Sequence, residues 1–500
     1  MSALRHAAAL LVVGFVMAAA IGTAPSVSAA LPAPHPTVSD YQFIAGGTTP
    51  PTEAQCEAVA RTCFTPQAIQ SAYNVGPLYA QGLDGRGITI AIVDSYGSDT
   101  MAHDLHVFDQ AFGVRPMCGE EGVTCVPGMP KFSELAMNGS PPTVAQPGNG
   151  THLEDKSAWA LEVALDVETS HAIAPGANIL LVHSNNAETL GVQGFPQMMK
   201  AEDYVVSHGL AQVISQSFAS AEDAFSTFTS IQNLRFAYIN AAANGVTVLG
   251  SSGDGGSANG TKQPTAKGGA LIPFPSVEWP ASDPLVTGIG GTYLCTDPTA
   301  STSQARTPYV KSGIGGKCGS SVYNPGGVFA EVAWTFSGGG FSHVFAKPTW
   351  QNTLPTGSTP IATMRGVPDV AFQASAGTGA LVYVSLPPDG NGSNVGASLS
   401  GWYDIGGTSL SCPQWAGLVA IADQLNGGGL GLINPALYKI GADSARYKND
   451  FFDVASGNTN QTDSSVAGYA ATKGWDAVTG LGTPNAANLV PDLVKAAHGQ

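Results

Sequence analysis

The chain contains few basic residues for its length. Lys and Arg together number 20 among 500 residues, against 36 Asp and Glu, and the net charge is −16. Binding to nucleic acid or to an anionic membrane depends on clustered Lys and Arg, so this balance argues against both partners. Charged residues of either sign make up only 11% of the chain, well below the usual ~25%. Because few Lys–Glu pairs are lost when carboxylates become protonated, the composition is compatible with an acidic medium.

Beyond its N-terminal segment the chain lacks a long apolar run. The one uncharged apolar stretch, residues 7–20, follows Arg5 and His6 and precedes a small-residue cleavage site at 27–30. This arrangement predicts a secretory signal peptide over residues 1–30. No later stretch approaches ~18 consecutive apolar residues, so we expect a soluble, exported protein without a membrane-spanning helix.

Zinc-binding Cys-x-x-Cys pairs are also missing, although the chain has seven cysteines. Six of them are near neighbours in sequence: Cys56 and Cys63, Cys118 and Cys125, and Cys295 and Cys318. In an oxidising compartment this spacing favours three local disulfides, although spacing alone leaves other pairings open. Cys412 remains, and we expect a buried small hydrophobic residue there rather than a reactive thiol.

Strand and helix signals alternate from residue 66 onward, where apolar β-branched runs predict buried strands and longer periodic segments predict helices. The predicted strands are 88–93, 178–183, 211–216 and 246–250, and the predicted helices are 67–73, 105–112, 157–172, 195–207 and 225–244, with a long loop at 115–150. This alternation predicts a doubly wound, mostly parallel α/β sheet with helices on both faces, in one large domain over 66–500. Residues 31–65 are predicted to be an N-terminal extension or a short pro-segment.

The most informative run is Gly-Gly-Thr-Ser-Leu-Ser-Cys-Pro at 406–413. A Gly-Gly turn precedes a small-residue helix predicted over 411–424, with Pro413 tolerated in its first turn. We therefore expect Ser409 to expose its hydroxyl at a helix N-terminus, where the helix dipole favours developing negative charge. The spacing Gly-Thr-Ser-x-x-x-Pro, followed by Trp-Ala-Gly at 415–417, resembles the nucleophile signature of subtilisin-like serine peptidases. A tight turn capped by Ser409 is the alternative explanation.

A serine nucleophile needs a base, and the sequence has no histidine in the place that subtilisins use. Asp94 ends the first predicted strand, as the triad Asp of subtilisins does. The counterpart of the subtilisin His motif is Asn-Gly-Thr-His at 149–152, in which Asn149 stands where the base belongs. An amide does not accept a proton, and His152 lies in the predicted loop, so a triad through His152 is the less favoured alternative.

Two acids on the helix predicted over 157–172 are better candidates for the base. Glu162 and Asp166 are four residues apart and share one helix face, with Trp159 one turn earlier. Their neighbours are apolar, and no Lys or Arg occurs between Lys156 and Lys200. Acids buried without a cation share a proton or meet a partner, whereas chance placement on a solvated face is the alternative.

These features together resemble the sedolisins, the serine-carboxyl peptidases of the subtilisin-like superfamily. Members of that family carry Glu-x-x-x-Asp on one helix, matched here by Glu162 and Asp166, and the nucleophile motif, matched at Ser409. They add an Asp for the oxyanion hole, matched by Asp254 in a Gly-rich run. The similarity spans roughly residues 65–490 in family order, and it implies a subtilisin-like fold.

The resemblance also implies a role for each acid. Ser409 attacks the scissile carbonyl while Glu162 takes its proton and Asp166 orients Glu162. Asp254, if neutral, donates a hydrogen bond to the oxyanion, aided by the Ser409 backbone N–H. Carboxyl groups with reference pKa values near 4 suit this chemistry only at about pH 3–5. Asp94 is then expected to have a supporting or substrate-subsite role.

A calcium loop near the C-terminus, at about 450–485, is a further implication of the resemblance. One structural Ca²⁺ would bind through two carboxylates, three backbone carbonyls and water. The implied ligands are Asp453, Val454, Thr472, Gly474 and Asp476.

The sequence thus predicts a secreted, acid-active serine-carboxyl endopeptidase that acts as a monomer on proteins or peptides. Two alternatives stay open: a neutral subtilisin-type protease using Asp94, His152 and Ser409, and a non-catalytic secreted binding module on the same fold. An inflection of the pH–rate profile near 6–7 would identify the first, because histidine titrates there. Inertness at every pH would identify the second.

Overall fold

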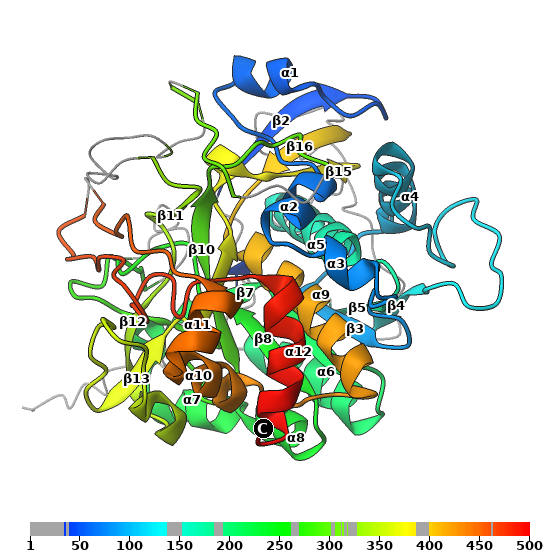
Figure 1. The fold of residues 1–500 in the computed structure, drawn as a ribbon. Helices are drawn as coiled ribbons and strands as arrows, with labels where there is room; N and C mark the ends of the chain where they lie inside the picture. The colour runs from blue at the N-terminus through cyan, green and yellow to red at the C-terminus, as the bar shows by residue number, and fades with distance from the viewer. Residues whose placement is uncertain are drawn as a thin grey trace, which may run out of the picture.

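An eight-stranded sheet lies at the centre of the structure (Figure 1). The computed structural model describes residues 35–36, 40–137, 153–184, 194–261, 270–301, 306–311, 313–314, 318, 328–386, 400–461 and 464–500. In sheet order the strands are β11 (Glu331–Ala333), β10 (Thr287–Leu294), β8 (Thr247–Ser251), β6 (Val213–Gln216), β3 (Thr89–Ser95), β5 (Asn178–Ser184) and β4 (Phe132–Ala136), and β14 (Val370–Gln373) pairs with β10. All these pairings are parallel except that of β10 with β11. The predicted mostly parallel α/β sheet is therefore confirmed.

Helices cover both faces of this sheet, as alternate side chains of β3 show. Ile90 and Ile92 belong to the core that contains helices α5 (Leu153–Ile173) and α9 (Thr408–Asn426). Ala91 and Val93 belong to the core of the opposite face, with helices α6 (Gly194–Ser207), α7 (Phe228–Leu234) and α8 (Phe236–Ala243). Burial on both faces explains why the strand is apolar throughout rather than alternating.

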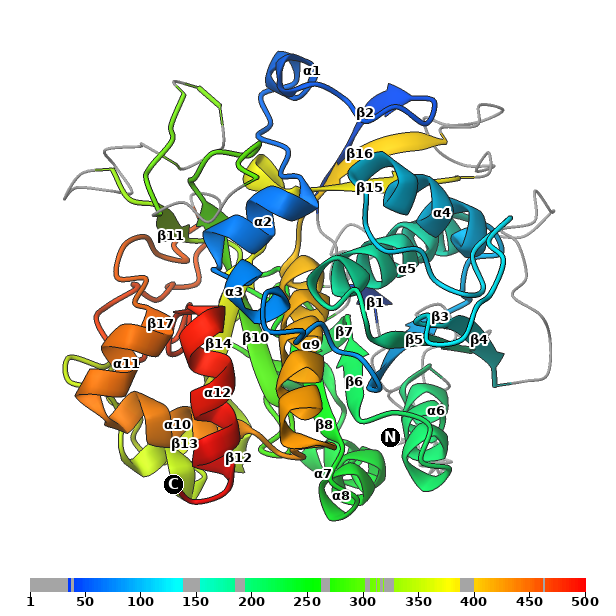
Figure 2. The same ribbon diagram turned by 45° about the vertical axis from the view of Figure 1, so that its right-hand side comes forward.

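Smaller elements complete the described structure (Figure 2). The remaining helices are α1 (Glu53–Ala58), α2 (Pro66–Ala72), α3 (Gly76–Tyr79), α4 (Met101–Phe112), α10 (Asn434–Ala442), α11 (Ser444–Asp450) and α12 (Ala486–Ala497). The remaining strands are β1 (His35–Pro36), β2 (Tyr41–Gly46), β7 (Phe218–Ala221), β9 (Glu278–Trp279), β12 (Gly340–Ala346), β13 (Met364–Val367), β15 (Ala380–Val384), β16 (Gly401–Ile405), β17 (Phe451–Phe452) and β18 (Thr483–Pro484). Short 3₁₀ turns lie at Glu222–Ala224, Thr349–Asn352 and Ala376–Thr378.

Three local predictions differ from the structure. The predicted loop at 115–150 contains β4, which adds a parallel strand beside β5. The single helix predicted over 225–244 is two helices, which meet at Arg235, where the guanidinium binds the buried Asp283 carboxylate. No strand is predicted within the N-terminal extension, yet it contains β2, which pairs with β16.

The cysteine prediction is confirmed. Disulfides join Cys56 to Cys63, Cys118 to Cys125 and Cys295 to Cys318. Cys412 is a buried free thiol in α9, and burial raises its pKa to about 12, so it is not a reactive thiolate.

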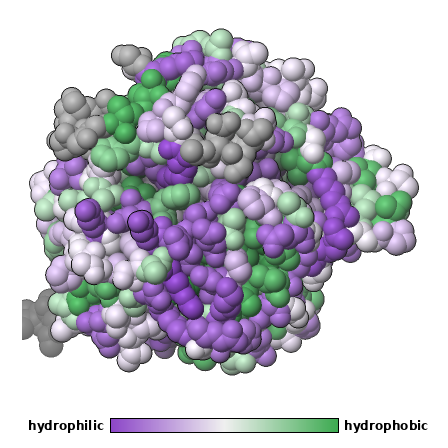
Figure 3. Space-filling model, in the orientation of Figure 1, coloured by the Kyte–Doolittle hydropathy of each residue, from purple (hydrophilic) through white to green (hydrophobic). Residues whose placement is uncertain are grey.

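The face of the molecule seen in Figure 3 mixes hydrophilic residues with small hydrophobic patches. Such patches are ordinary on folded proteins. Among the described residues, no helix combines the length and the apolar character needed to cross a membrane.

Candidate active site

The nucleophile turn connects β16 to α9. Gly407 has φ 126°, a conformation that residues with a Cβ rarely adopt. A Cβ on Gly406 would lie 2.1 Å from the Ala376 backbone nitrogen, so the close approach of these two chains also requires glycine. The helix begins at Thr408, three residues before the predicted start. Pro413 therefore lies inside the helix rather than in its first turn, and it offers no N–H to the carbonyl of Ser409.

Ser409 meets a carboxylate rather than an imidazole. Its Oγ donates a hydrogen bond to Oε1 of Glu162, which lies on α5 beside α9. Both residues are fully buried, so the expectation of an exposed serine hydroxyl was wrong, because α5 packs over the start of α9. A base in hydrogen-bond contact with a hydroxyl is the arrangement that general-base activation of serine requires.

Two more buried carboxyl groups, those of Asp166 and Asp94, lie near Glu162. Asp166 lies one turn further along α5, and burial, then the charges of Asp94 and Glu162, raise its pKa well above the usual value. Asp94 lies near the end of β3, and burial raises its pKa to about 8. In acid both Asp166 and Asp94 therefore carry protons, and Asp166 remains neutral beside Glu162. In acid these two groups therefore add no negative charge beside Glu162.

Asp254 lies on the other side of the nucleophile, at the start of α9. Its Oδ1 accepts hydrogen bonds from the Thr408 backbone N–H at 2.7 Å and from the Thr408 hydroxyl at 2.9 Å. The same hydroxyl accepts a hydrogen bond from the Gly253 N–H at 3.0 Å. Glu278 of β9 is buried nearby, and burial, then the charge of Asp254, raise its pKa to about 8. In an acidic medium Glu278 therefore carries a proton and adds no charge beside Asp254.

The structure brings Ser409, Glu162, Asp166 and Asp254 to one place at the start of α9. Asn149 and His152, on which the alternative triad depends, lie outside the described residues. Sequence reasoning missed Glu278 and Thr408. An acid inside the apolar run before Pro280 was the signal for Glu278, and the fixed Thr of the Gly-Thr-Ser motif was the signal for Thr408.

At one edge of the site, strand β7 pairs with a short extended segment, β1. β7 follows Ser217, a buried residue close to Asp166, and it pairs on one side with β9, which carries Glu278. On its other side β7 pairs antiparallel with β1, with His35 opposite Ala219 and Pro36 opposite Phe218 (Figure 2). The chain direction in β1 therefore runs toward Ser217 and the buried acids. This edge of β7 accepts an extended backbone as an added strand.

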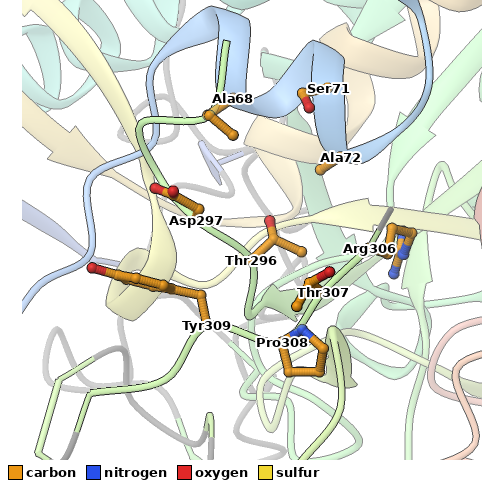
Figure 4. Close-up of a pocket in the computed structure, with 10 residues that line it drawn as sticks. Ala68, Ser71, Ala72, Thr296, Asp297, Arg306, Thr307, Pro308 and Tyr309 are labelled. Carbon is orange, nitrogen blue, oxygen red and sulfur yellow. The ribbon is translucent and has the colours of Figure 1, made fainter. Parts of the chain in front are cut away.

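A cavity of about 330 Å³ opens between α2 and the segment after β10 (Figure 4). Its lining includes Ser71, Asp297, Arg306 and Tyr309 but none of the predicted catalytic residues. The Arg306 guanidinium there is already engaged by the Glu331 carboxylate. We assign this cavity no part in the chemistry.

The residues of the expected calcium loop lie together near the C-terminus. The Gly474 N–H lies 3.2 Å from both carboxylate oxygens of Asp453, and the Thr472 N–H donates to Asp476 at 3.0 Å. Burial, then the charges of Asp453 and Asp476, raise the pKa of Tyr447, so both acids lie near one phenol. Within the described ranges, no three His, Cys, Asp or Glu side chains are placed to hold a metal. A cation here would depend on backbone carbonyls beside the two carboxylates, an all-oxygen set that suits Ca²⁺.

Comparison with known proteins identifies the family. The chain is 30% identical over 454 residues to kumamolisin of Bacillus sp. (strain MN-32), covering 89% of this chain and 66% of that protein. It is 31% identical over 342 residues to sedolisin of Pseudomonas sp. (strain 101), covering 68% of this chain and 50% of that protein. The chain thus spans between half and two thirds of the length of these relatives, and no family model matches it.

A solved structure agrees with the sequence relatives. The structure of Pseudomonas sedolisin, a serine-carboxyl proteinase complexed with pseudo-iodotyrostatin, superposes with a TM-score of 0.59 at 26% identity. The match covers 86% of this chain and 98% of that one, so it includes nearly the whole solved domain. Sequence, fold and site geometry agree that this chain belongs to the sedolisin family.

Proposed function

We propose that this protein is an acid-active serine-carboxyl endopeptidase that is exported from the cell and hydrolyses proteins or peptides as a monomer. The observation that carries the proposal is the hydrogen bond from Ser409 Oγ to the buried carboxylate of Glu162. Export rests on the signal-peptide pattern of residues 1–30. The kinship to kumamolisin and sedolisin supports the same activity.

In the proposed mechanism, Ser409 Oγ attacks the scissile carbonyl as its proton passes to Glu162. Asp166, kept neutral by burial and by Asp94, lies one turn along α5 from Glu162 and adds no second negative charge beside it. A protonated Asp254 and the Ser409 backbone N–H stabilise the oxyanion. Glu162 then gives its proton to the leaving amine, which departs and leaves an acyl-enzyme. Water, deprotonated by Glu162, attacks the ester, and the proton returns to Ser409 as the acid product leaves.

The edge of β7 is the proposed binding strand for the substrate. A peptide bound antiparallel there runs toward Ser217 and Asp166, as β1 does in this structure. Main-chain hydrogen bonds to a sheet edge bind a peptide regardless of its side chains, which suits a protease acting on varied sequences. Because β1 pairs with this edge, His35 and Pro36 must move aside before a substrate binds there.

The proposal predicts a pH–rate profile confined to acid. With a denatured protein as substrate, activity should be greatest at about pH 3–5, since Glu162 must be ionised while Asp254 keeps its proton. Above that range an ionised Asp254 repels the oxyanion, and hydrolysis should fall to background by about pH 7. Ser409→Ala should be inert throughout. An inflection near pH 6–7 would instead indicate an imidazole base and contradict the proposal.

We further propose that one structural Ca²⁺ binds to Asp453, Asp476 and the carbonyls of Val454, Thr472 and Gly474. Bound Ca²⁺ would tie β17 to the loop that precedes β18, close to Tyr447. Its role is structural, because this loop carries none of the proposed catalytic residues.

Calcium removal should lower the melting temperature. A ligand present at 100 times its Kd stabilises the folded state by about 2.7 kcal/mol, which for a domain of more than about 400 residues corresponds to a shift of about 3 °C. Calorimetry at pH 5 before and after EDTA measures the shift, and added Ca²⁺ should restore it. Asp453→Asn/Asp476→Asn should melt at the lower temperature with or without calcium. A wild-type melting temperature that does not change with calcium would refute the proposed Ca²⁺ site.

A further inference from the structure

The strand that leads into the nucleophile is paired with a segment from the far N-terminus of the chain. β2 runs antiparallel to β16, from Tyr41 opposite Ile405 to Gly46 opposite Gly401 (Figures 1 and 2). Just before β2, the Asp40 carbonyl accepts a hydrogen bond from the Gly406 N–H at 3.1 Å. Gly406 opens the turn that carries Ser409, three residues further on. The backbone of Asp40 therefore holds one side of the nucleophile turn.

The opposite side of the turn is held by the core. The Gly407 N–H donates to the Ala374 carbonyl at 2.5 Å, and Gly406 lies against the Ala376 backbone. The turn is thus fixed between the chain around Ala374 and the carbonyl of Asp40. Of these two supports, only Asp40 comes from the segment expected to be an extension or a pro-segment.

Arg61 ties this N-terminal support to β16. Its guanidinium makes two 2.9 Å hydrogen bonds to the carboxylate of Asp40. One of its nitrogens lies 4.0 Å from the carboxylate of Asp404, which lies in β16 two residues before Gly406. Asp404 is fully buried, and within the described part of the chain no hydrogen-bond donor reaches either of its carboxylate oxygens. Arg61 therefore faces carboxylates from both chains at one end of this strand pair, the end next to Gly406.

The position of Arg61 is itself fixed. The disulfide between Cys56 and Cys63 closes the loop that carries it. Immediately after it, the Thr62 N–H donates to the Gly377 carbonyl at 3.1 Å, and the Phe64 N–H donates to the Gly379 carbonyl at 2.8 Å. These two hydrogen bonds hold the segment against the chain around Gly377 and Gly379, which lies beside Asp404. A removable pro-segment would not need to complete the three-stranded sheet of β15, β16 and β2 in this way.

We propose that the chain from Asp40 to Cys63 stays in the active enzyme as a support of the nucleophile turn, and that Arg61 is a positioning residue for Ser409. Arg61 touches no reacting atom; it acts by holding Asp40 against Gly406. The inference rests on the proposed peptidase function. Displacing a catalytic group by 1 Å can cost up to ~100-fold in rate, so loss of this tie is expected to lower kcat.

The test compares Arg61→Met with Arg61→Lys in the full chain, using a peptide substrate at pH 4. Arg61→Met should lower kcat about tenfold. The rate is calculated per active site, and active sites are counted by labelling with a serine-directed covalent inhibitor. KM should change less than twofold, because the substitution does not affect β7, the strand proposed to bind the substrate. Arg61→Lys, which keeps a cation but loses the two-pronged contact, should recover only part of the rate, with a kcat about threefold below wild type. Arg86→Met is the matched control, because Arg86 pairs with Asp84 at the surface, and it should equal wild type. The intact mass of the active wild-type enzyme should include Asp40.

A wild-type kcat in Arg61→Met would overturn the inference, as would a fully active enzyme whose chain begins after Cys63. If Arg61→Met fails to fold, Arg61→Lys decides the matter, since a kcat equal to wild type in that variant also overturns it. In each of these cases the wild type still hydrolyses its substrate and the proposed function stands. A wild type inert at every pH removes the proposed function, and the positioning role of Arg61 is refuted with it.

Discussion

Glu162→Gln should reduce kcat at pH 4 by about 10⁴-fold while leaving KM within a few-fold of wild type. Glutamine keeps the size of the side chain and still accepts a hydrogen bond from Ser409, but it does not take up the proton. Removal of the base of a serine nucleophile costs on the order of 10⁴–10⁶ in kcat. The measurement is hydrolysis of a chromogenic peptide between pH 2 and 8 at saturating concentration.

Matched variants separate this effect from damage to the buried helix. Glu168→Gln changes another buried acid of α5, which accepts the Tyr383 N–H from β15, and it should keep activity within about threefold. Asp254→Ala should lower kcat by about 10²–10³, because the hydrogen-bond donor to the oxyanion is lost. His152→Ala should stay active. The carboxylate mechanism would be disproved by an active Glu162→Gln together with an inert His152→Ala.

The parts of this site that could be predicted are those set by local sequence. Glu162 and Asp166 share a helix face because they are four residues apart, and this follows from helix geometry alone. The Gly-Gly sequence before Ser409 predicts a turn, because glycine readily adopts the positive φ that Gly407 has in the structure. The predicted strands around Ile90 and Val213 are confirmed because a strand buried on both faces is apolar along its whole length.

The parts that could not be predicted depend on contacts between distant segments. Ser409 is buried because α5 packs on α9, and no local pattern encodes that packing. Thr408 and Asp254 are 154 residues apart, and their hydrogen bonds depend on where β8 ends relative to α9. β2 is an edge strand in a Pro- and Gly-rich region, and only its pairing with β16 makes it a strand.

The stability of the folded protein should be greatest in acid and fall steeply between pH 4 and 8. Several buried acids have raised pKa values in the folded state, chiefly through burial: about 8 for Asp94 and Glu278 and about 7 for Asp423. The pKa values of Glu168, Glu202 and Asp404 are raised further, again mainly by burial. In the unfolded chain all these groups titrate near pH 4.

The sign of the effect follows from proton counts. Below pH 4 both states carry these protons, and the stabilising contribution is at its maximum. Between pH 4 and 8 the folded state binds more protons than the unfolded state, so the free energy of unfolding falls as pH rises. One pKa unit corresponds to about 1.4 kcal/mol. A few such groups therefore outweigh the 5–15 kcal/mol stability typical of a domain, and we expect the melting temperature to fall by more than about 10 °C by pH 7.

Calorimetry from pH 3 to 8 measures this fall, and Glu202→Gln identifies its cause. Glu202 is fully buried in α6, and among the described residues no hydrogen-bond donor reaches its carboxylate. An amide there cannot ionise, so the variant should melt above wild type at pH 7 but not at pH 3. Glu121→Gln, at an exposed site paired with His103, should follow wild type at both pH values. A wild-type melting temperature that is flat or rises from pH 4 to 7 would contradict the argument.

Glu202→Gln also separates the two expected reasons for lost activity at neutral pH, which are the weaker fold and the ionised site. Wild-type activity at pH 7 is expected to be lost both because the fold weakens and because the site ionises. Glu202 lies in the core on the face of the sheet opposite the α5–α9 pair, and it takes no part in the proposed mechanism. The variant should therefore retain more folded protein than wild type at pH 7, by circular dichroism, yet hydrolyse no substrate, because an ionised Asp254 still repels the oxyanion. Recovery of neutral activity in this variant would show that unfolding alone confines the enzyme to acid.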